Sequence, residues 1–258
     1  MTNKMNTIKT SIIIALALVT SVAVKAQDVK LIPNELTFVN YFYAGKDYKF
    51  REYTECDPFP VDTLLDISIT TEAYYSSLKE SQISYIVVDT ANHYKKDSIL
   101  ILPVGKNFIE LKDEKNIEGN YNSLYFYEGE IPFLNSYLIS WSGYEDYSLF
   151  LIDKTTGEHN KIGFAHYPFI SPNKKYVVCI YENYFFTRAE MQVFKIVEGN
   201  IEFLYLFHFV NWLPTAEGTS LVWIDDNSFV IKVIHPSFQK KPDIQNEKGE
   251  YIKIEILK

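Results

Sequence analysis

A tight polar turn that runs straight into an apolar strand recurs along this chain, and this recurrence constrains the fold more than any other feature. The clearest example is ISPNKKYVVCIYENYFF, residues 170–186, where Ser-Pro-Asn-Lys precedes Tyr-Val-Val-Cys-Ile-Tyr. Comparable strands begin near Ile99, Leu138, Val177 and Phe229, at intervals of 39, 39 and 52 residues. One small sheet cannot bury both of its faces alone, so the recurrence predicts sheets stacked in series.

A second strand, with alternating apolar and polar residues, follows each first strand. These second strands begin at Phe108, Tyr147, Met191 and Tyr251. Gly157 and Gly199 lie in the turns that follow two of them, where a hairpin needs a positive φ. Third strands are predicted at about 159–164 and 201–209. The unit is therefore three or four antiparallel strands in about 40 to 50 residues, which is typical of propeller blades.

The predicted fold is all-β and propeller-like, with about five small antiparallel blades. A β-sandwich or an open multi-sheet β domain is the structural alternative. Residues 27–258 are expected to form a single domain whose amino-terminal part, 27–94, fits the unit poorly. That part contains an extended segment at 36–43 and a short helix at about 72–80, with Thr71 as its N-cap.

One unit supports a family resemblance. The stretches LIDKTTGE and FISPNKKYVV, within residues 147–182, resemble one blade of the TolB-type β-propeller repeat of exported bacterial proteins. That family places a Ser-Pro-Asp-Gly-Lys turn before an apolar strand. Here Asn173 stands in place of the Asp and Lys174 in place of the Gly, and looser echoes extend over 95–234. The resemblance implies blade architecture and says little about activity, because propellers serve binding, scaffolding and catalysis.

The first 26 residues have the pattern of a secretory signal peptide. Lys4 and Lys9 precede an apolar run from Ile12 to Val24, and small residues at positions 24 and 26 suit a signal peptidase. An uncleaved anchor or a buried helix is the alternative. No cysteine lies at the cleavage point to carry a lipid. We therefore expect an exported protein, periplasmic or extracellular, that is soluble and has no stable membrane insertion after cleavage.

The charge of the chain bears on its partners. Three of its 25 basic residues and none of its 33 acidic residues lie in 1–26, so the remaining 232 residues carry a net charge of −11. Such a surface would repel phosphates, which argues against nucleic acid and against anionic lipid. The expected partner is an unidentified protein or glycan, and no cofactor is predicted.

Two cysteines in an exported chain suggest a disulfide. Cys179 lies in a predicted strand and Cys56 in a loop next to prolines. A bridge between them would close a long loop and stabilise the fold by about 4 kcal/mol. The alternative is that Cys179 is a small buried apolar residue.

The sequence contains no short motif of catalysis or metal binding. Its five histidines lack ligand spacing, and nucleophile elbow, phosphate-loop and dinucleotide patterns are absent. Asp225-Asp226-Asn227 could offer oxygen ligands to a cation but suits an ordinary turn. Glu145-Asp146 suits a solvated hairpin loop. No metal site is predicted, and catalytic residues remain unassigned.

Aromatic residues are the most distinctive part of the composition, with 20 Tyr, 18 Phe and 3 Trp. Rings in loops can stack on sugars or peptide side chains, which makes Tyr144, Tyr184 and Phe185 the candidate ligand-binding residues. Packing between sheets is the alternative use. The sequence favours an exported, non-catalytic binding or scaffold protein. A glycan hydrolase with carboxylates at a central channel, and a structural component of an envelope assembly, are the competing hypotheses.

Overall fold

The computed structural model describes ten stretches of the chain, all within the compact unit Pro33–Lys258. These are residues 38–41, 64–89, 95–115, 121–143, 146–160, 162–183, 188–209, 213–214, 221–234 and 249–257. The segment expected to be a signal peptide lies outside the described residues. No helix within the described stretches is long and apolar enough to cross a membrane.

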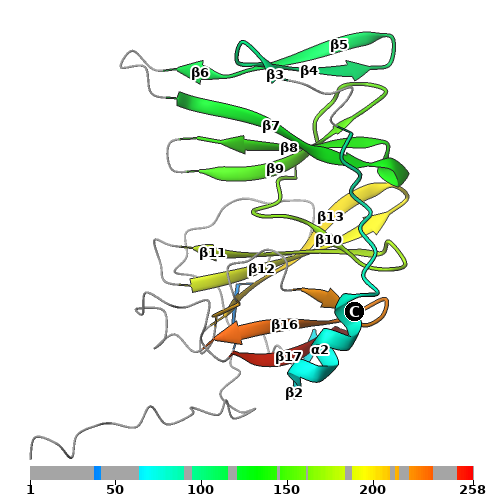
Figure 1. Cartoon of the computed structure of the whole chain (residues 1–258), viewed down its shortest axis with the longest axis vertical. Coiled ribbons are helices and arrows are strands. Elements are labelled where there is room, and N and C mark those ends of the chain that lie inside the picture. Colours follow the sequence, from blue (N-terminus) through cyan, green and yellow to red (C-terminus); the bar gives the residue numbers. More distant parts are fainter. Residues whose placement is uncertain are drawn as a thin grey trace, which may run out of the picture. The chain divides into compact units, whose positions relative to one another are not determined.

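Four small antiparallel sheets make up the described fold, and none closes on itself (Figure 1). Sheet I has the order β3-β4-β5, and sheet II has the order β6-β7-β8-β9. The strands of sheet I are β3 (Lys95–Lys96), β4 (Ile99–Val104) and β5 (Asn107–Lys112). Those of sheet II are β6 (Glu114–Lys115), β7 (Tyr121–Ile131), β8 (Ser136–Ser142) and β9 (Tyr147–Asp153), with a 3-10 turn, η3 (Pro132–Leu134), between β7 and β8.

Sheets III and IV each combine one early strand with strands from later in the chain. Sheet III has the order β1-β13-β12-β11-β10, and sheet IV has the order β14-β16-β17-β2, with β15 also paired to β16. The strands of sheet III are β1 (Phe38–Tyr41), β10 (Phe169–Ile170), β11 (Tyr176–Asn183), β12 (Arg188–Val197) and β13 (Asn200–Phe209). Those of sheet IV are β2 (Leu65–Thr70), β14 (Leu213–Pro214), β15 (Val222–Trp223), β16 (Ser228–Ile234) and β17 (Glu250–Ile256).

The all-β class and the four predicted strand starts are confirmed. The strands β4, β8, β11 and β16 contain Ile99, Leu138, Val177 and Phe229, in that order. Each pairs with the predicted second strand that follows it, namely β5, β9, β12 and β17. Each is also flanked on its other side by an earlier strand in its own sheet. The architecture is that of an open multi-sheet β domain, with four sheets in the described residues where about five were expected.

The turn at residues 171–174, which precedes β11, is closed by the polar side chains of its own residues. Ser171 is fully buried, and its Oγ accepts hydrogen bonds from the main-chain N–H groups of Lys175 at 3.1 Å and Tyr176 at 2.9 Å. Asn173 Oδ1 also accepts from Lys175 N–H at 2.9 Å. Lys174 has a φ of 60°, in the left-handed region. Polar turn residues therefore replace main-chain partners just before β11 begins.

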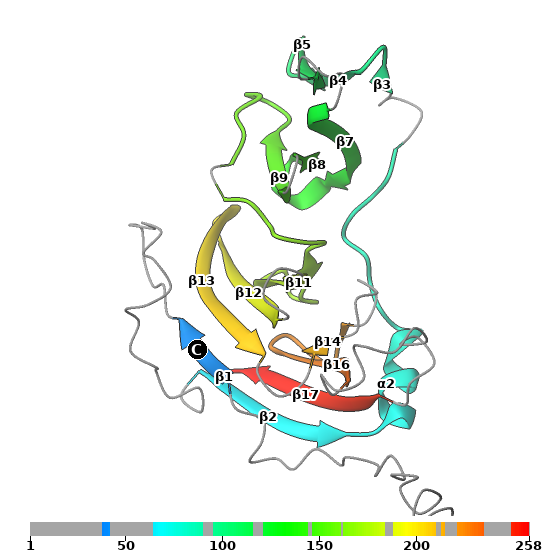
Figure 2. The ribbon, with the colours of Figure 1, turned by 90° about the vertical axis from the view of Figure 1, so that its left-hand side faces the viewer.

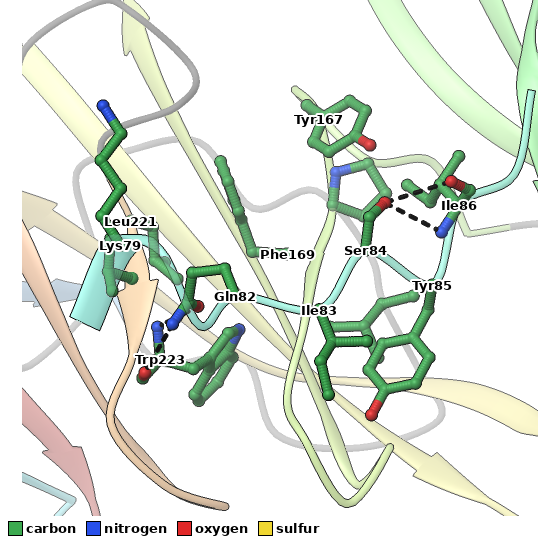
Figure 3. Close-up of a pocket in the computed structure, with 13 residues that line it drawn as sticks. Lys79, Gln82, Ile83, Ser84, Tyr85, Ile86, Tyr167, Phe169, Leu221 and Trp223 are labelled. Atoms are coloured by element: carbon green, nitrogen blue, oxygen red, sulfur yellow. Dashed lines mark hydrogen bonds between the residues drawn. The ribbon is translucent and has the colours of Figure 1, made fainter.

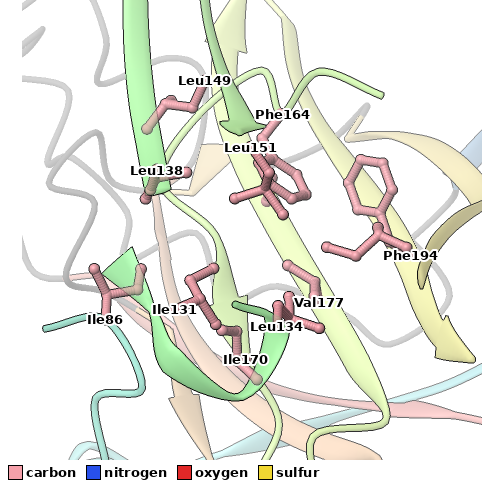
Figure 4. Packing of buried hydrophobic residues seen from close by; sticks show 12 residues of the cluster. Ile86, Ile131, Leu134, Leu138, Leu149, Leu151, Phe164, Ile170, Val177 and Phe194 are labelled. Atoms are coloured by element: carbon pink, nitrogen blue, oxygen red, sulfur yellow. The ribbon is translucent and has the colours of Figure 1, made fainter. Parts of the chain in front are cut away.

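Side chains on the two faces of sheet II pack against two different sheets. On β8, Tyr137 and Ile139 join Leu100 and Leu102 of sheet I in one buried cluster. Leu138, which points the other way, joins a cluster that contains residues of sheet III, and Figure 4 shows Leu138, Ile170, Val177 and Phe194 of that cluster. Both faces of the strand are buried, which explains why β8 is apolar at successive positions instead of alternating.

The predicted helix is confirmed as α2 (Glu72–Lys79). Thr71 caps it as expected, because its Oγ1 accepts a hydrogen bond from Tyr74 N–H at 3.2 Å. The helix covers part of sheet IV, where Tyr75 packs against Tyr251 with ring centroids 5.0 Å apart. Figure 2 shows α2 at the end of β2, which lies alongside β17.

The third strand predicted at 159–164 is wrong. In the described part of this segment only two isolated bridges form, from His159 to Ile152 and from Phe164 to Leu149. Asn160 gives the physical reason, because its Oδ1 accepts a hydrogen bond from Ile162 N–H at 3.2 Å. This local turn competes with a continuous ladder of main-chain hydrogen bonds. The other third strand, 201–209, is confirmed as β13.

A candidate binding pocket

A cavity of about 270 Å³ lies where three separate segments of the chain meet (Figure 3). The first wall is the chain that leaves α2, residues 79 and 82–86. The second is residues 167–170, which lead into β10, and the third is residues 221–223 around β15. The walls of this pocket are far apart in the chain, so no local sequence pattern predicts it.

Gln82 fixes the first wall against the third. Its Oε1 accepts a hydrogen bond from Trp223 N–H at 2.8 Å, and its Nε2 donates to Trp223 O at 3.0 Å. The same Nε2 also donates to Leu78 O at 3.1 Å. The amide of Gln82 therefore satisfies both main-chain groups of Trp223 and ties β15 to the end of α2.

The chain beyond Gln82 is held at two more points. Tyr85 Oη donates a hydrogen bond to Pro172 O at 2.5 Å, which joins this segment to the turn before β11. Val87 and Glu130 exchange two main-chain hydrogen bonds, of 2.9 and 2.8 Å. Gly129 permits this contact, since a Cβ there would lie 2.7 Å from Ile86 Cγ2. Ile86 is thereby fixed as part of the pocket wall.

The pocket is lined mainly by apolar and aromatic side chains. Tyr85, Tyr167, Phe169 and Trp223 contribute the rings. Among the described residues of the lining, Lys79 is the one that is charged and none is acidic. Apolar walls with a few polar groups are typical of sites for small molecules.

The indole of Trp223 leaves a hydrogen-bond donor unused. Its side chain is buried, with 6% exposed, and its Nε1 has no partner among the described residues. In Figure 3 the indole nitrogen lies on the side of the ring that faces Gln82 and Ile83. An unpaired buried donor costs about 1–3 kcal/mol.

A second polar cluster lies beside Tyr167. Ser140 Oγ donates a hydrogen bond to Glu128 Oε1 at 2.6 Å. Burial, followed by the charge of Glu128, raises the pKa of Tyr147. The Tyr147 ring lies 6.4 Å from that of His166, whose Nδ1 is buried without a partner in the described structure. This cluster contains one carboxylate, whereas glycoside hydrolysis uses two.

The candidate residues from the sequence are placed only in part. Tyr144, Tyr184, Phe185 and Cys56 lie outside the described residues, so the ligand-binding assignment and the disulfide stay predictions. Cys179 is fully buried in β11, and this burial raises the pKa of its thiol well above the ordinary value.

The acidic turn at Asp225 serves the backbone. Its Oδ1 accepts hydrogen bonds from the N–H groups of Asn227 at 2.9 Å and Ser228 at 2.8 Å. Burial alone would raise the pKa of Asp225, but these hydrogen bonds outweigh it and lower the pKa. Among the described residues no group of three potential ligands could hold a metal ion.

The fold and the pocket together define the class of this protein as a multi-sheet all-β protein with an apolar, aromatic-lined cavity. No family model, curated protein or solved structure matches the chain. The function must therefore be argued from the pocket itself.

Proposed function

We propose that this chain is an exported, non-catalytic binding protein on a propeller-like body, and that the pocket beside β15 is its binding site. The observation that carries the proposal is a cavity of about 270 Å³ where three chain segments meet, lined mainly by apolar and aromatic side chains. An apolar cavity of this kind binds the body of a small ligand.

Three features support the propeller-like body. Sheet II packs against sheet I on one face and sheet III on the other, as blades do. The early strand β2 completes sheet IV beside the late strand β17, so one sheet combines an early and a late part of the described fold. Lys174 has a left-handed φ at the position where the TolB-type turn has Gly, and this conformation fits the resemblance.

Thermal unfolding with a panel of small ligands tests the proposal, because any ligand that binds only the folded state raises the melting temperature. Ile83 lines the pocket and is 65% exposed, so Ile83→Trp should fill the mouth of the pocket without disturbing the core. Val88 is the matched control, since it is 59% exposed on the same segment and does not line the pocket. We expect Ile83→Trp to abolish the ligand shift and Val88→Trp to preserve it. Equal shifts in both variants would move the binding site elsewhere.

The glycan hydrolase is the second candidate function, and Glu128, which accepts a hydrogen bond from Ser140, is the one carboxylate of the described cluster that could serve it. Incubation with oligosaccharides, followed by measurement of reducing ends, tests this reading. Under the binding proposal neither the native protein nor a Glu128→Gln variant releases sugar. Release by the native protein that Glu128→Gln abolishes would replace the binding proposal with the enzymatic one.

A further inference from the structure

We infer that the free edge of β5 takes up one more strand, and that residues 28–32 of a second copy of this chain supply it. The inference is independent of the pocket beside β15. Three observations support it: a strand position that is used in the other sheets and open in sheet I, the direction of the main-chain groups of β5, and the charge pattern along β5.

The second strand of each repeat has a neighbour on its outer edge in sheets II, III and IV. This neighbour is β13 for β12 and β2 for β17, and β9 forms two isolated bridges with residues 159 and 164. Among the described residues, β5 pairs with β4 alone. In sheet IV the added strand comes from a distant part of the chain, so this fold already completes one sheet by strand addition.

The outer edge of β5 presents main-chain groups that can accept another strand. Asp113 N–H donates to Ser98 O of the β3–β4 hairpin at 2.9 Å, which fixes the side to which odd-numbered residues point. Because successive residues of a strand direct their N–H and C=O groups to opposite sides, those of Phe108, Glu110 and Lys112 point away from β4. No described residue bonds to them. An unpaired edge of this kind is a template for a further strand.

The side chains on this edge select the strand that can be added. Phe108, Glu110 and Lys112 point to the same face of sheet I and are exposed, Phe108 to 69%. Like charges directly opposite each other are destabilising, whereas opposite charges stabilise a pair of strands. The added strand therefore needs a basic residue opposite Glu110, an acidic residue opposite Lys112 and an apolar residue opposite Phe108.

Residues 28–32, with the sequence Asp-Val-Lys-Leu-Ile, meet this requirement when they run antiparallel to β5. These residues lie outside the described stretches, so their sequence alone carries this step. Their charges fall opposite charges of the other sign, and their apolar side chains fall opposite apolar ones. The pairs, with the residue of β5 second, are Asp28–Lys112, Val29–Leu111, Lys30–Glu110, Leu31–Ile109 and Ile32–Phe108.

The register also suits both ends of the added strand. Pro33 falls opposite Asn107, where the N–H that proline lacks would point away from β5. Gln27, the first residue after the predicted signal peptide, falls opposite Asp113. The next residue along this edge, Glu114, pairs with β7. The room for another strand therefore ends where the exported chain is expected to begin.

The length of the connection assigns the strand to a second copy. Residues 33–37 join the segment to β1, which belongs to sheet III. The chain from residue 32 to residue 38 spans at most about 20 Å. Sheet II packs between sheets I and III, and packed sheets lie about 10 Å apart, so even a straight path through sheet II needs about 20 Å. A path around sheet II is longer. Two copies that exchange these segments about a two-fold axis would complete both edges.

Sedimentation equilibrium of residues 27–258 with charge-reversed variants tests the inference. We expect the protein to be a dimer, and Lys30→Glu and Glu110→Lys should each weaken the dimer about fivefold or more, because like charges then lie opposite each other. The double variant restores opposite charges and should recover the native affinity. Lys106→Glu is the matched control and should change little, since Lys106 is exposed in the turn of the same hairpin and outside the pairs. Thermal unfolding verifies that each variant is folded.

A protein that stays monomeric would overturn the inference. A dimer that neither single reversal weakens, or that the double variant fails to restore, would show that another surface joins the copies and would overturn it equally.

A synthetic peptide of residues 27–33 tests the direction of the main-chain groups, because it should compete for β5 and dissociate the dimer. N-methylation at Lys30 removes an N–H that faces β5 in the proposed register, whereas N-methylation at Val29 removes one that faces away. The first change should weaken competition about tenfold or more, and the second should leave most of it. Equal effects of the two changes, or no competition by the unmodified peptide, would refute the proposed pairing.

Discussion

Replacing Gly129 with alanine should destabilise this protein more than alanine at any turn glycine. Gly129 has a φ of +142°, and a Cβ would lie 2.7 Å from Ile86 Cγ2 and 2.9 Å from Val87 O. A strained backbone conformation of this kind costs about 1–3 kcal/mol, and overpacking a closely packed site costs about 1–3 kcal/mol more. We therefore expect a loss of about 2–6 kcal/mol in the free energy of unfolding. The main-chain oxygen of Val87 cannot turn away, because Glu130 N–H bonds to it at 2.8 Å.

Two other glycines separate the backbone cost from the steric cost. Gly199 has a φ of +81°, and a Cβ there would meet no atom within 4 Å. Gly199→Ala should therefore show the backbone cost alone, about 1–2 kcal/mol. Gly163 lacks a positive φ, and its nearest contact would be Leu149 O at 3.7 Å. Gly163→Ala should be neutral or slightly stabilising, by up to about 1 kcal/mol.

Urea unfolding followed by near-ultraviolet circular dichroism measures all three variants, with linear extrapolation to water. The order of the losses is the decisive result. If Gly129→Ala costs no more than Gly199→Ala, the chain at Ile86 and Val87 is not held as closely as described. The wall of the pocket would then also be less rigid than the binding proposal requires.

Three further measurements test buried polar groups. Burial lowers the pKa of His166, so the unfolded chain takes up a proton near pH 6.5 that the folded protein binds only at lower pH. This contribution to the free energy of unfolding is present above pH 6.5 and is lost as the pH falls. His166→Gln should therefore reduce the decline in unfolding free energy between pH 7 and pH 5. An unchanged decline in urea titrations would contradict this. Asp113→Asn should cost about 2 kcal/mol in the same assay, below the 3–5 kcal/mol of a fully buried pair. The carboxylate of Asp113 lies 2.6 Å from Nζ of Lys95, and the Lys95 side chain is 24% exposed. The carboxylate also accepts a hydrogen bond from Tyr125 N–H at 3.0 Å. A loss of unfolding free energy below about 0.5 kcal/mol would show that the ion pair behaves like one on the surface. In a Cys56→Ala variant, a thiol reagent should label Cys179 only after unfolding, because the side chain is fully buried; rapid labelling of the native protein would refute that burial.

Local sequence signals predicted the strands and the helix well, because their causes lie within a few residues. The turn at Ser171 satisfies its own main chain, so it is readable without any distant partner. Thr71 marks the start of α2 for the same reason. The strand predicted at 159–164 was wrong because Asn160 forms a local turn there, and the prediction did not take this turn into account.

The pocket could not be predicted, because its geometry depends on contacts between distant segments. Gln82 and Trp223 are 141 residues apart, and nothing near Gln82 in the sequence indicates that its amide replaces a strand partner. The apolar residues Ile83, Val87 and Val88 follow the helix in the sequence, but their exposure is seen only in the structure. The burial of an unpaired indole N–H is visible only once the fold is assembled.

The pairing of β2 with β17 bears on how the protein is made. Strand β2 leaves the ribosome well before residues 250–256, its hydrogen-bonding partner. Until those residues have been made, this edge of β2 lacks its native neighbour and is open to pairing with other chains. Loss of β17, for example through a premature stop codon before residue 250, would therefore leave an early strand without its partner, and aggregation of nascent chains should be the first symptom.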